Sequence, residues 1–306
     1  MNKQPLVSIC CITYNHAPFI RQCLDGMLMQ QVNFLYEIII NDDCSNDGTS
    51  DIIREYAIRY PNIIKPIFHN DNQYKKGIRN IFEKFVFPIA NAKYISLCEG
   101  DDYWTDSKKL QRQVDFLESH PEYSLCFHNA IVHYQDEKLN DHVFSEIQER
   151  EYNRKELLAS WIAPTASFVF NKNVLSSTIY EKVANSERLE YRDLPILLSA
   201  SYCGKIYGIR DAMSVYRIHS GGAMQTHSSI PLKLCFHQIE CRKIFKDDLK
   251  SIFNDKIGRN ASIAISLFRH QKYTMGIKLW FVAFVYAPID ALKWSVKYFT
   301  NFIKRK

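Results

Sequence analysis

Residues 94–104 read YISLCEGDDYW, an apolar run that ends abruptly in carboxylates. The apolar residues of 94–98 predict a buried strand. The carboxylates at its carboxyl end are Glu99, Asp101 and Asp102, and such close negative charges repel one another unless a cation lies between them. Oxygen ligands of this kind suit Mg²⁺ or Mn²⁺, with phosphate oxygens of a substrate completing the shell. A solvated acidic turn is the alternative, but the preceding strand and the two aromatic residues that follow favour a functional site.

Upstream of this run, strand patterns and helix patterns alternate. Strands are expected at 6–13, 36–40, 63–69 and 94–98, and helices at 20–28, 52–60, 78–86 and 110–117. This order predicts a mostly parallel sheet with helices on both faces. Ligands of such sheets bind beyond the carboxyl ends of the strands. The polar clusters 13–16, 41–49 and 99–103 all fall at those ends.

Downstream, the pattern changes twice. Residues 123–217 mix expected strands with a helix near 193–203, and from residue 231 onward the pattern is almost entirely helical. The strands of the mixed part are expected at 124–133, 166–170 and 205–209. We therefore expect an α/β domain followed by a helical region.

The C-terminal tail carries most of the net charge. Of the formal +6, residues 269–306 contribute +7, so that the rest of the chain is nearly neutral. A basic tail beside a neutral body favours an anionic membrane surface over nucleic acid as partner. Apolar residues at 289, 292, 296, 299 and 303 form one stripe, with Lys293, Lys297 and Lys304 off it, which is typical of an interfacial helix. Packing of the stripe on the protein or a dimer contact is the alternative.

Cysteine usage and the N-terminus both favour the cytoplasm. The nine cysteines contain no C-x-x-C pair, which indicates neither a zinc ribbon nor a disulfide framework. No signal peptide pattern precedes the first strand. The longest uncharged apolar run of the tail, 279–289, is shorter than the roughly 20 residues that span a bilayer. We expect a cytoplasmic protein that is peripherally associated with the inner face of the plasma membrane.

Two polar clusters end the first and second strands. The first reads TYNH at 13–16 and the second NDDCSNDGT at 41–49. A carboxylate at a strand end accepts hydrogen bonds from a base edge or a ribose hydroxyl, and an aromatic ring stacks on a base. Taken alone, 41–49 also suits a turn that leads into a helix cap at Thr49.

Together these motifs resemble glycosyltransferase family 2. The TYN, NDDCSNDGT and CEGDDYW motifs, each after a strand, resemble that family in order and separation. Residues 72–80 and 108–121 resemble it as well, and the similarity covers about 5–220. The resemblance implies the GT-A fold, a Rossmann-like, mostly parallel sheet. It divides the chain into a catalytic domain over 1–222, with a nucleotide-sugar half of about 1–122 and an acceptor half of about 123–222, and a helical C-terminal region over 223–306.

The resemblance places a nucleotide sugar at the strand ends. Thr13 and Tyr14 would border the nucleoside, with Asp43 at the base. Asp101 would bind the metal that bridges the diphosphate, and Glu99, which replaces the commoner Asp of the D-x-D motif, would face the ribose. The full expected nucleotide-sugar site is Thr13, Tyr14, Asn15, Asp42, Asp43, Lys76, Arg79, Glu99, Gly100, Asp101 and Asp102.

The resemblance also implies a general base and a second metal ligand. In inverting members the base is an Asp at the start of a later helix, and the segment EYRDLP at 190–195 matches with Asp193. A helix cap is the alternative role of Asp193, and Glu190 is the alternative base. The segment VYRIHSGG at 215–222 resembles the family segment whose His joins the metal, so His219 is an expected ligand.

The acceptor side is expected around a tryptophan. Trp161, Thr165 and Ser167 belong to a stretch that resembles the family's acceptor wall, although Trp161 also suits a hydrophobic core. We expect an inverting, Mn²⁺- or Mg²⁺-dependent transferase that moves a sugar from a UDP-sugar to a glycan or lipid-linked glycan in cell-surface polysaccharide synthesis. A silent scaffold and a nucleotidyltransferase are the alternatives. The carboxylates argue against the first, and the lack of Gly in 13–19 argues against the second.

Overall fold

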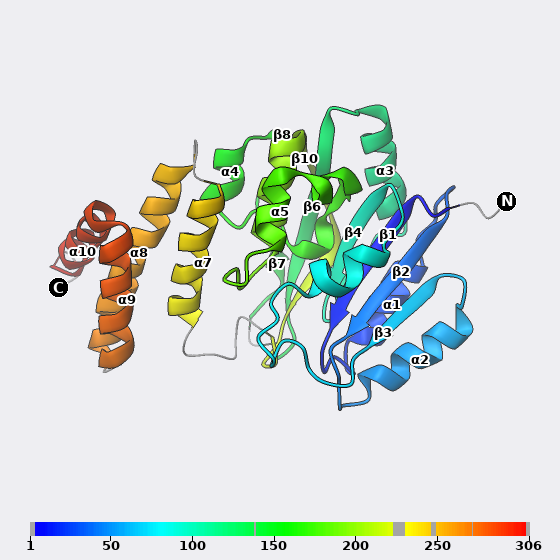
Figure 1. Cartoon of the computed structure of the whole chain (residues 1–306), viewed down its shortest axis with the longest axis horizontal. Coiled ribbons are helices and arrows are strands. Elements are labelled where there is room, and N and C mark those ends of the chain that lie inside the picture. Colours follow the sequence, from blue (N-terminus) through cyan, green and yellow to red (C-terminus); the bar gives the residue numbers. More distant parts are fainter. Residues whose placement is uncertain (1–3, 138, 223–229, 246–248, 271, 304–306) are drawn as a thin grey trace. The chain divides into compact units, whose positions relative to one another are not determined.

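The computed structural model describes residues 4–137, 139–222, 230–245, 249–270 and 272–303 (Figure 1). The chain divides into two compact units. Unit 1 comprises Met1–Asn185 and Ile196–His219, and unit 2 comprises Ser186–Pro195 and Ser220–Lys306.

Unit 1 is built on one mixed sheet. Its strands are β1 (Val7–Thr13), β2 (Tyr36–Asp42), β3 (Ile64–Phe68), β4 (Tyr94–Glu99), β5 (Tyr103–Trp104), β6 (Tyr123–Tyr134), β7 (His142–Val143), β8 (Arg150–Tyr152), β9 (Val169–Asn171) and β10 (Lys205–Ile218). The strand order is β3-β2-β1-β4-β9-β6-β10-β5, with β7 paired to β6 and β8 paired to β10. The first four strands are parallel, as the sequence predicts. β9 runs antiparallel to both of its neighbours.

Helices complete unit 1. Those before β6 are α1 (Ile20–Leu28), α2 (Thr49–Arg59), η1 (Phe82–Val86), η2 (Phe87–Ile89) and α3 (Lys109–Ser119). Those after β8 are α4 (Arg154–Ala159), η3 (Thr165–Ser167), η4 (Lys172–Ser176), α5 (Thr178–Ala184) and the part of α6 (Asp193–Cys203) from Ile196 onward.

The core of unit 1 follows from the strand alternation. Val7, Ile9 and Cys11 of β1 are fully buried and join one apolar cluster with residues of α1, α2 and α3. Alternate strand residues face opposite sides of a sheet. The intervening Ser8 therefore points away from this cluster, where its hydroxyl donates to the Glu37 carboxylate at 2.6 Å. Burial on both faces explains why the strands read as continuous apolar runs.

The helix expected over 78–86 is shorter and less regular than the spacing predicts. Residues 82–86 form a π-helical turn, and a 3₁₀ turn follows over 87–89. Pro88 lacks a backbone N–H and cannot continue an α-helix. The apolar spacing correctly indicated a buried segment, because Phe82, Val86 and Phe87 are all buried. It did not predict the type of helix.

Unit 2 contains four longer helices in its described part: α7 (Ile230–Ile244), α8 (Lys250–Arg269), α9 (Tyr273–Tyr286) and α10 (Pro288–Ile303). α8 packs against the other three. At Gly258 of α8 an added Cβ would lie 2.5 Å from the Cβ of Asp290 of α10, so only a glycine allows this close approach. The indole N–H of Trp294 donates to Asp255 at 2.8 Å and joins the same two helices. No helix in the described ranges is both long and apolar enough to cross a membrane.

Candidate active site

The carboxyl ends of β1, β2 and β4 meet at one edge of the sheet in unit 1. The strand register pairs Thr13 with Asp42 and Ile12 with Glu99. Two backbone hydrogen bonds extend this pairing beyond the strands: the N–H of Asp43 donates to Thr13 at 3.0 Å, and the N–H of Gly100 donates to Ile12 at 2.9 Å. The motifs that are far apart in the sequence are therefore adjacent in space.

The loop after β1 turns His16 back toward this edge. Asn15 has a left-handed backbone with φ 54°, a conformation in which Asn is enriched among non-glycine residues. Its side-chain oxygen accepts the N–H of Asn46 at 3.0 Å. The N–H of His16 donates to the Thr49 hydroxyl at 2.9 Å, and its carbonyl accepts the N–H of Ile20 at 2.8 Å. The 41–49 loop thus holds His16 at the start of α1.

Arg217 brings the end of β10 to the acidic turn. Its backbone N–H donates to Oδ1 of Asp102 at 2.9 Å, and its Nε donates to the carbonyl of Asp101 at 2.8 Å. The guanidinium also donates to Gln135 and Gln22 at 2.6 and 2.7 Å. Because His219 follows β10 directly, these bonds fix the position of the imidazole beside the turn.

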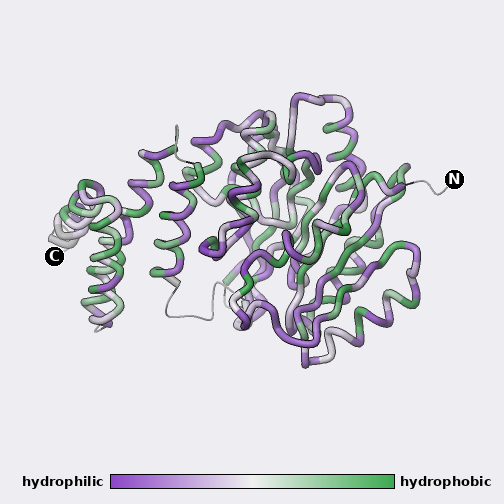
Figure 2. Tube along the Cα trace, in the orientation of Figure 1, coloured by the Kyte–Doolittle hydropathy of each residue, from purple (hydrophilic) through white to green (hydrophobic). Residues whose placement is uncertain are grey.

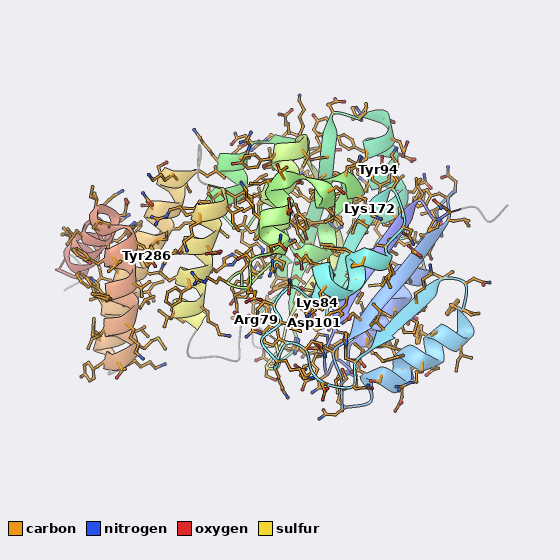
Figure 3. All side chains as sticks on the ribbon, viewed as in Figure 1. Arg79, Lys84, Tyr94, Asp101, Lys172 and Tyr286 are labelled. Carbon is orange, nitrogen blue, oxygen red and sulfur yellow. The ribbon has the colours of Figure 1, made fainter. Side chains whose placement is uncertain are left out.

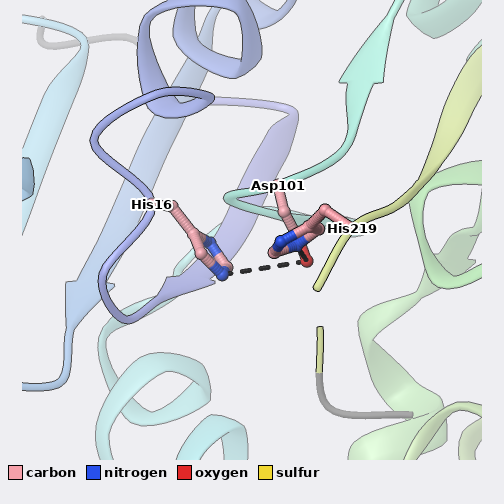
Figure 4. A group of neighbouring side chains, drawn as sticks. All are labelled: His16, Asp101 and His219. Carbon is pink, nitrogen blue, oxygen red and sulfur yellow. Dashed lines mark hydrogen bonds and ion pairs between the residues drawn. The ribbon is translucent and has the colours of Figure 1, made fainter. Parts of the chain in front are cut away.

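His16, Asp101 and His219 point toward one another (Figure 4). Oδ2 of Asp101 lies 3.1 Å from Nε2 of His219 and 3.7 Å from Nε2 of His16. One donor atom from each residue lies within 4.8 Å of the other two, close enough to hold one metal ion. The three side chains are only 9–20% exposed. Asp101 and His219 were predicted as ligands from the sequence, and His16 was not.

Electrostatics favour the protonation states that bind a cation. Burial lowers the pKa of His16, outweighing the opposite effect of Asp101, so the imidazole stays neutral. Burial opposes ionisation of Asp101, but the hydrogen bond with His219 holds its pKa below the usual value. Asp102 behaves differently: full burial, and then the charges of Asp101 and Glu99, raise its pKa well above that of an ordinary carboxyl. Metals bind neutral imidazole and ionised carboxylate, so Asp101 rather than Asp102 suits the metal.

Gly100 allows the acidic turn to approach β1. A Cβ at this position would lie 2.4 Å from the hydroxyl oxygen of Thr13 and 3.0 Å from Nδ1 of His16. Neither atom has a hydrogen-bond partner within the described residues. Because Gly100 has no Cβ, the acidic turn can lie directly against the side chains of Thr13 and His16.

Replacing Gly100 by Ala is expected to push the acidic turn away from β1. Overpacking of this kind costs about 1–3 kcal/mol of unfolding free energy, and the displaced Asp101 would lower the affinity for Mn²⁺. Urea unfolding and calorimetric titration of Mn²⁺ measure the two effects. If stability and Mn²⁺ affinity both match the wild type, the turn does not depend on this close approach.

The 71–80 loop covers Asp43 at the end of β2. Both carboxylate oxygens of Asp43 accept backbone N–H groups, from Gln73 at 2.6 Å and from Tyr74 at 3.0 Å. Arg79 comes from the same loop, and Asp101 from the turn after β4 (Figure 3). The guanidinium of Arg79 lies 3.9 Å from the ring centroid of Tyr74. Asp43 thus positions the loop that carries the predicted Arg79.

Two further predicted residues contact this loop or lie within it. Lys76 forms an ion pair with Asp71 at 2.7 Å. The Tyr14 hydroxyl accepts a hydrogen bond from Lys75 at 3.0 Å. Lys76 is thus paired within the loop, and Lys75 joins the loop to Tyr14, which follows β1.

The Asp42 carboxylate is held by hydrogen bonds to the segment that follows β2. Asp42 is buried, and its carboxylate accepts hydrogen bonds from the Ser45 and Ser50 hydroxyls. The sequence placed the helix cap at Thr49, but the cap residue of α2 is Gly48 and Thr49 is the first helical residue. The 41–49 cluster therefore contains the turn that the sequence suggested as an alternative, and this turn stabilises the site edge.

The predicted acceptor residues occupy different environments. Trp161 is 45% exposed and packs edge-on against Phe144 and Tyr216, with ring centroids 5.0 and 5.4 Å away. Thr165 and Ser167 are both buried, and the Ser167 hydroxyl donates to a backbone carbonyl at 2.7 Å. Trp161 is thus the exposed member of this set.

The predicted base and its alternative both belong to unit 2. Asp193 is the first residue of α6. Glu190 forms an ion pair with Lys233 at 2.8 Å, and its side chain is 14% exposed. The ion pair occupies a carboxylate oxygen that would have to contact the acceptor hydroxyl, which disfavours Glu190 as the base.

Comparison with known sequences agrees with these motifs. The family model described as Glycosyl transferase family 2 matches residues 8–178. The uncharacterized protein Rv1520 of Mycobacterium tuberculosis is 37% identical over 217 residues, which cover 71% of this chain and 60% of that protein. The putative teichuronic acid biosynthesis glycosyltransferase TuaG of Bacillus subtilis is 32% identical, with 38% of this chain and 43% of TuaG covered. The chain thus matches only part of the length of these relatives.

Solved structures share the fold. S. aureus TarS 1–349 in complex with UDP-GlcNAc superposes with a TM-score of 0.59 at 16% identity, covering 81% of this chain and 69% of TarS. The mannosyltransferase PcManGT from Pyrobaculum calidifontis, in complex with GDP-Man and Mn²⁺, gives a TM-score of 0.57 at 15% identity, with 92% and 73% covered. The chain belongs to glycosyltransferase family 2 and has the GT-A fold that its motifs predict.

Proposed function

We propose that this chain is an inverting, metal-dependent glycosyltransferase that uses a nucleotide-diphospho-sugar as donor. The observation that carries the proposal is the cluster of His16, Asp101 and His219 at the sheet edge where the nucleotide motifs meet. The acceptor we propose is a glycan or lipid-linked glycan of a cell-surface polysaccharide, at the inner face of the plasma membrane. TuaG, whose name refers to teichuronic acid biosynthesis, supports this acceptor class.

The described residues fit a divalent cation. Asp101 supplies a carboxylate oxygen, and His16 and His219 supply imidazole nitrogens on the same side. A bound cation would neutralise the charge of the leaving diphosphate. Two imidazoles and one carboxylate favour Mn²⁺ over Mg²⁺, because Mg²⁺ prefers oxygen ligands. The Mn²⁺ in the PcManGT complex supports this choice.

The residues of this chain would hold the donor from three sides. Asp43 and the 71–80 loop border the proposed base site, and Tyr14 lies against that loop through Lys75. Glu99, at the end of β4, would face the ribose. Because TarS binds UDP-GlcNAc, we propose a UDP-sugar as donor, and GDP-Man in PcManGT is the competing class.

Asp193 is the proposed general base for the acceptor hydroxyl. A base must take that proton as the hydroxyl attacks the sugar. Asp193 lies at the start of α6, and the partial positive charge of a helix N-terminus stabilises an ionised carboxylate there. The ionised form is the one that accepts a proton.

A donor screen tests the proposal. Thermal unfolding is followed with UDP-sugars and GDP-mannose, each with Mn²⁺, with Mg²⁺ and with EDTA. At a ligand concentration 100 times the Kd, binding stabilises the folded state by about 2.7 kcal/mol, which raises the melting temperature by several degrees. We expect this increase with a UDP-sugar and Mn²⁺, and none with EDTA. Equal melting temperatures in all conditions would refute nucleotide-sugar binding.

A further inference from the structure

Unit 2 exposes an apolar row along α9. Tyr273, Ile277, Phe281 and Val285 recur every four residues, and each is 54–62% exposed. Residues four apart lie on the same side of a helix. The opposite side, with Gly276, Leu279 and Ala283, is buried. Hydrophobic residues occupy most of α9 (Figure 2).

A second exposed row follows on α10. Ile289, Leu292 and Val296 are 80%, 51% and 64% exposed. These are the first three members of the stripe that the sequence predicts, while the side chains of Phe299 and Ile303, and all of Lys304, lie outside the described residues. We call the exposed rows, Tyr273, Ile277, Phe281, Val285, Ile289, Leu292 and Val296, the α9–α10 apolar surface.

The internal packing of unit 2 does not use this surface. α10 contacts α8 through its other side, where Ala291 is buried and the Trp294 indole donates to Asp255 at 2.8 Å. On α9, Ala283 and Trp280 fill the corresponding inner position. From the sequence, the stripe at 289–303 either packs on the protein or faces outward. Its described members, Ile289, Leu292 and Val296, are exposed, and other residues of α10, such as Ala291 and Trp294, make the packing contacts.

Basic residues accompany the α9–α10 apolar surface. Lys278 and Lys297 follow Ile277 and Val296 by one residue, and Lys293 follows Ile289 by four, so that the lysines flank the apolar rows. Lys293 lies 3.7 Å from a carboxylate oxygen of Asp255 in α8, and the Lys297 ammonium lies 4.3 Å from the ring centroid of Trp294. All three lysines are exposed. The acidic residue of these two helices, Asp290, lies against Gly258 of α8. The surface therefore combines apolar side chains with net positive charge.

We propose that the α9–α10 apolar surface docks unit 2 on a lipid membrane with anionic headgroups. This inference rests on the membrane location in the proposed function. It adds which surface of the protein contacts the membrane and which class of lipid it binds. Apolar residues enter the boundary between headgroups and acyl chains, aromatic residues suit that boundary, and lysines pair with lipid phosphates. The exposed apolar side chains are too numerous on one unit to be scattered surface residues.

A second copy of the chain fits this surface less well. A symmetric dimer places the same patch of each subunit face to face. Such an interface would bring three exposed lysines from each copy close together, and the carboxylate beside them, Asp255 of α8, is already paired with Lys293 at 3.7 Å. Like charges in such an interface repel. Anionic headgroups carry the complementary charge.

Vesicle binding of the full chain tests the proposal. The apolar variants are I277S/F281S and I289S/V296S, and their control is L35S/I58S, which changes two exposed apolar residues of unit 1. The charge variant is K293Q/K297Q, and its control is K155Q/K182Q, which changes two exposed lysines of unit 1. Each protein is sedimented with phosphatidylglycerol–phosphatidylcholine vesicles and with pure phosphatidylcholine vesicles.

We expect the wild type and both controls to sediment with the anionic vesicles. Each apolar variant is expected to bind at least about tenfold more weakly. The charge variant is expected to lose about fivefold per lysine on anionic vesicles and nothing on pure phosphatidylcholine. Circular dichroism verifies that every variant is folded.

Two results would overturn the inference. In the first, the wild type does not sediment with anionic vesicles. In the second, analytical ultracentrifugation without lipid shows a dimer that I277S/F281S or I289S/V296S dissociates, which assigns the surface to a second copy. Calorimetric binding of UDP with Mn²⁺ is measured on the same variants. Because it depends on unit 1, loss of vesicle binding with intact UDP binding separates this inference from the proposed donor chemistry.

Discussion

Replacing Asp101 by Asn is expected to abolish the Mn²⁺-dependent binding of a nucleoside diphosphate. Asn has nearly the same size, so the turn after β4 keeps its shape, but the negative charge between His16 and His219 is lost. A metal that stabilises the leaving diphosphate contributes several kcal/mol, so transfer should fall by at least about 100-fold. Titration calorimetry with UDP, with and without Mn²⁺, measures the binding, and a radiolabelled donor measures transfer.

Two further variants show whether the effect belongs to the metal site. D115N removes an exposed carboxylate on α3 that bonds only to Gln111 among the described residues, and it should behave as the wild type. H16Q removes the third donor, and we expect at least about tenfold weaker Mn²⁺ binding. If Asp101→Asn keeps Mn²⁺-dependent UDP binding, the cluster does not hold the metal. If H16Q binds Mn²⁺ as tightly as the wild type while Asp101→Asn does not, Asp101 and His219 hold the metal without His16.

The sheet was predictable because its strands are buried. Apolar runs at β1, β2 and β4 have few alternatives to a covered parallel strand, and the structure has each of them at the expected place. The length of β10 was not predictable from the same signal. In the sequence, only 205–209 has the pattern of a strand, because Arg210 and Asp211 interrupt the apolar residues. In the structure, these two residues are exposed, and the pairing of β10 with β6 shifts register there. An irregularity of this kind removes the periodicity on which the prediction depends.

The cluster of His16, Asp101 and His219 was predictable in part. Asp101 and His219 were expected together from their motifs, and the structure places them 3.1 Å apart. His16 was overlooked although it belongs to the polar cluster that ends β1. The only available signal was its position at that edge of the sheet. Its direction depends on the left-handed backbone of Asn15 and on the hydrogen bond to Thr49, and neither feature can be derived from one sequence.

Replacing Asp193 by Asn is expected to remove transfer and to leave donor binding intact. A general base contributes about 10²- to 10⁴-fold to the rate, and it acts on the acceptor hydroxyl rather than on the nucleotide. We therefore expect kcat to fall within this range, while the Kd for UDP with Mn²⁺ stays at the wild-type value. The opposite pattern is expected for Asp101→Asn, in which donor binding itself is lost.

Glu190→Gln is the matched control for this variant. Both carboxylates lie in unit 2 within one short segment, and both changes remove one charge while keeping the size of the side chain. Glu190 is already paired with Lys233, so its loss should affect the free energy of unfolding more than the rate of transfer. If Glu190→Gln stops transfer in a folded protein while Asp193→Asn does not, the base is Glu190. If neither variant slows transfer, neither residue takes the proton, and the base must come from another part of the chain or from the acceptor itself.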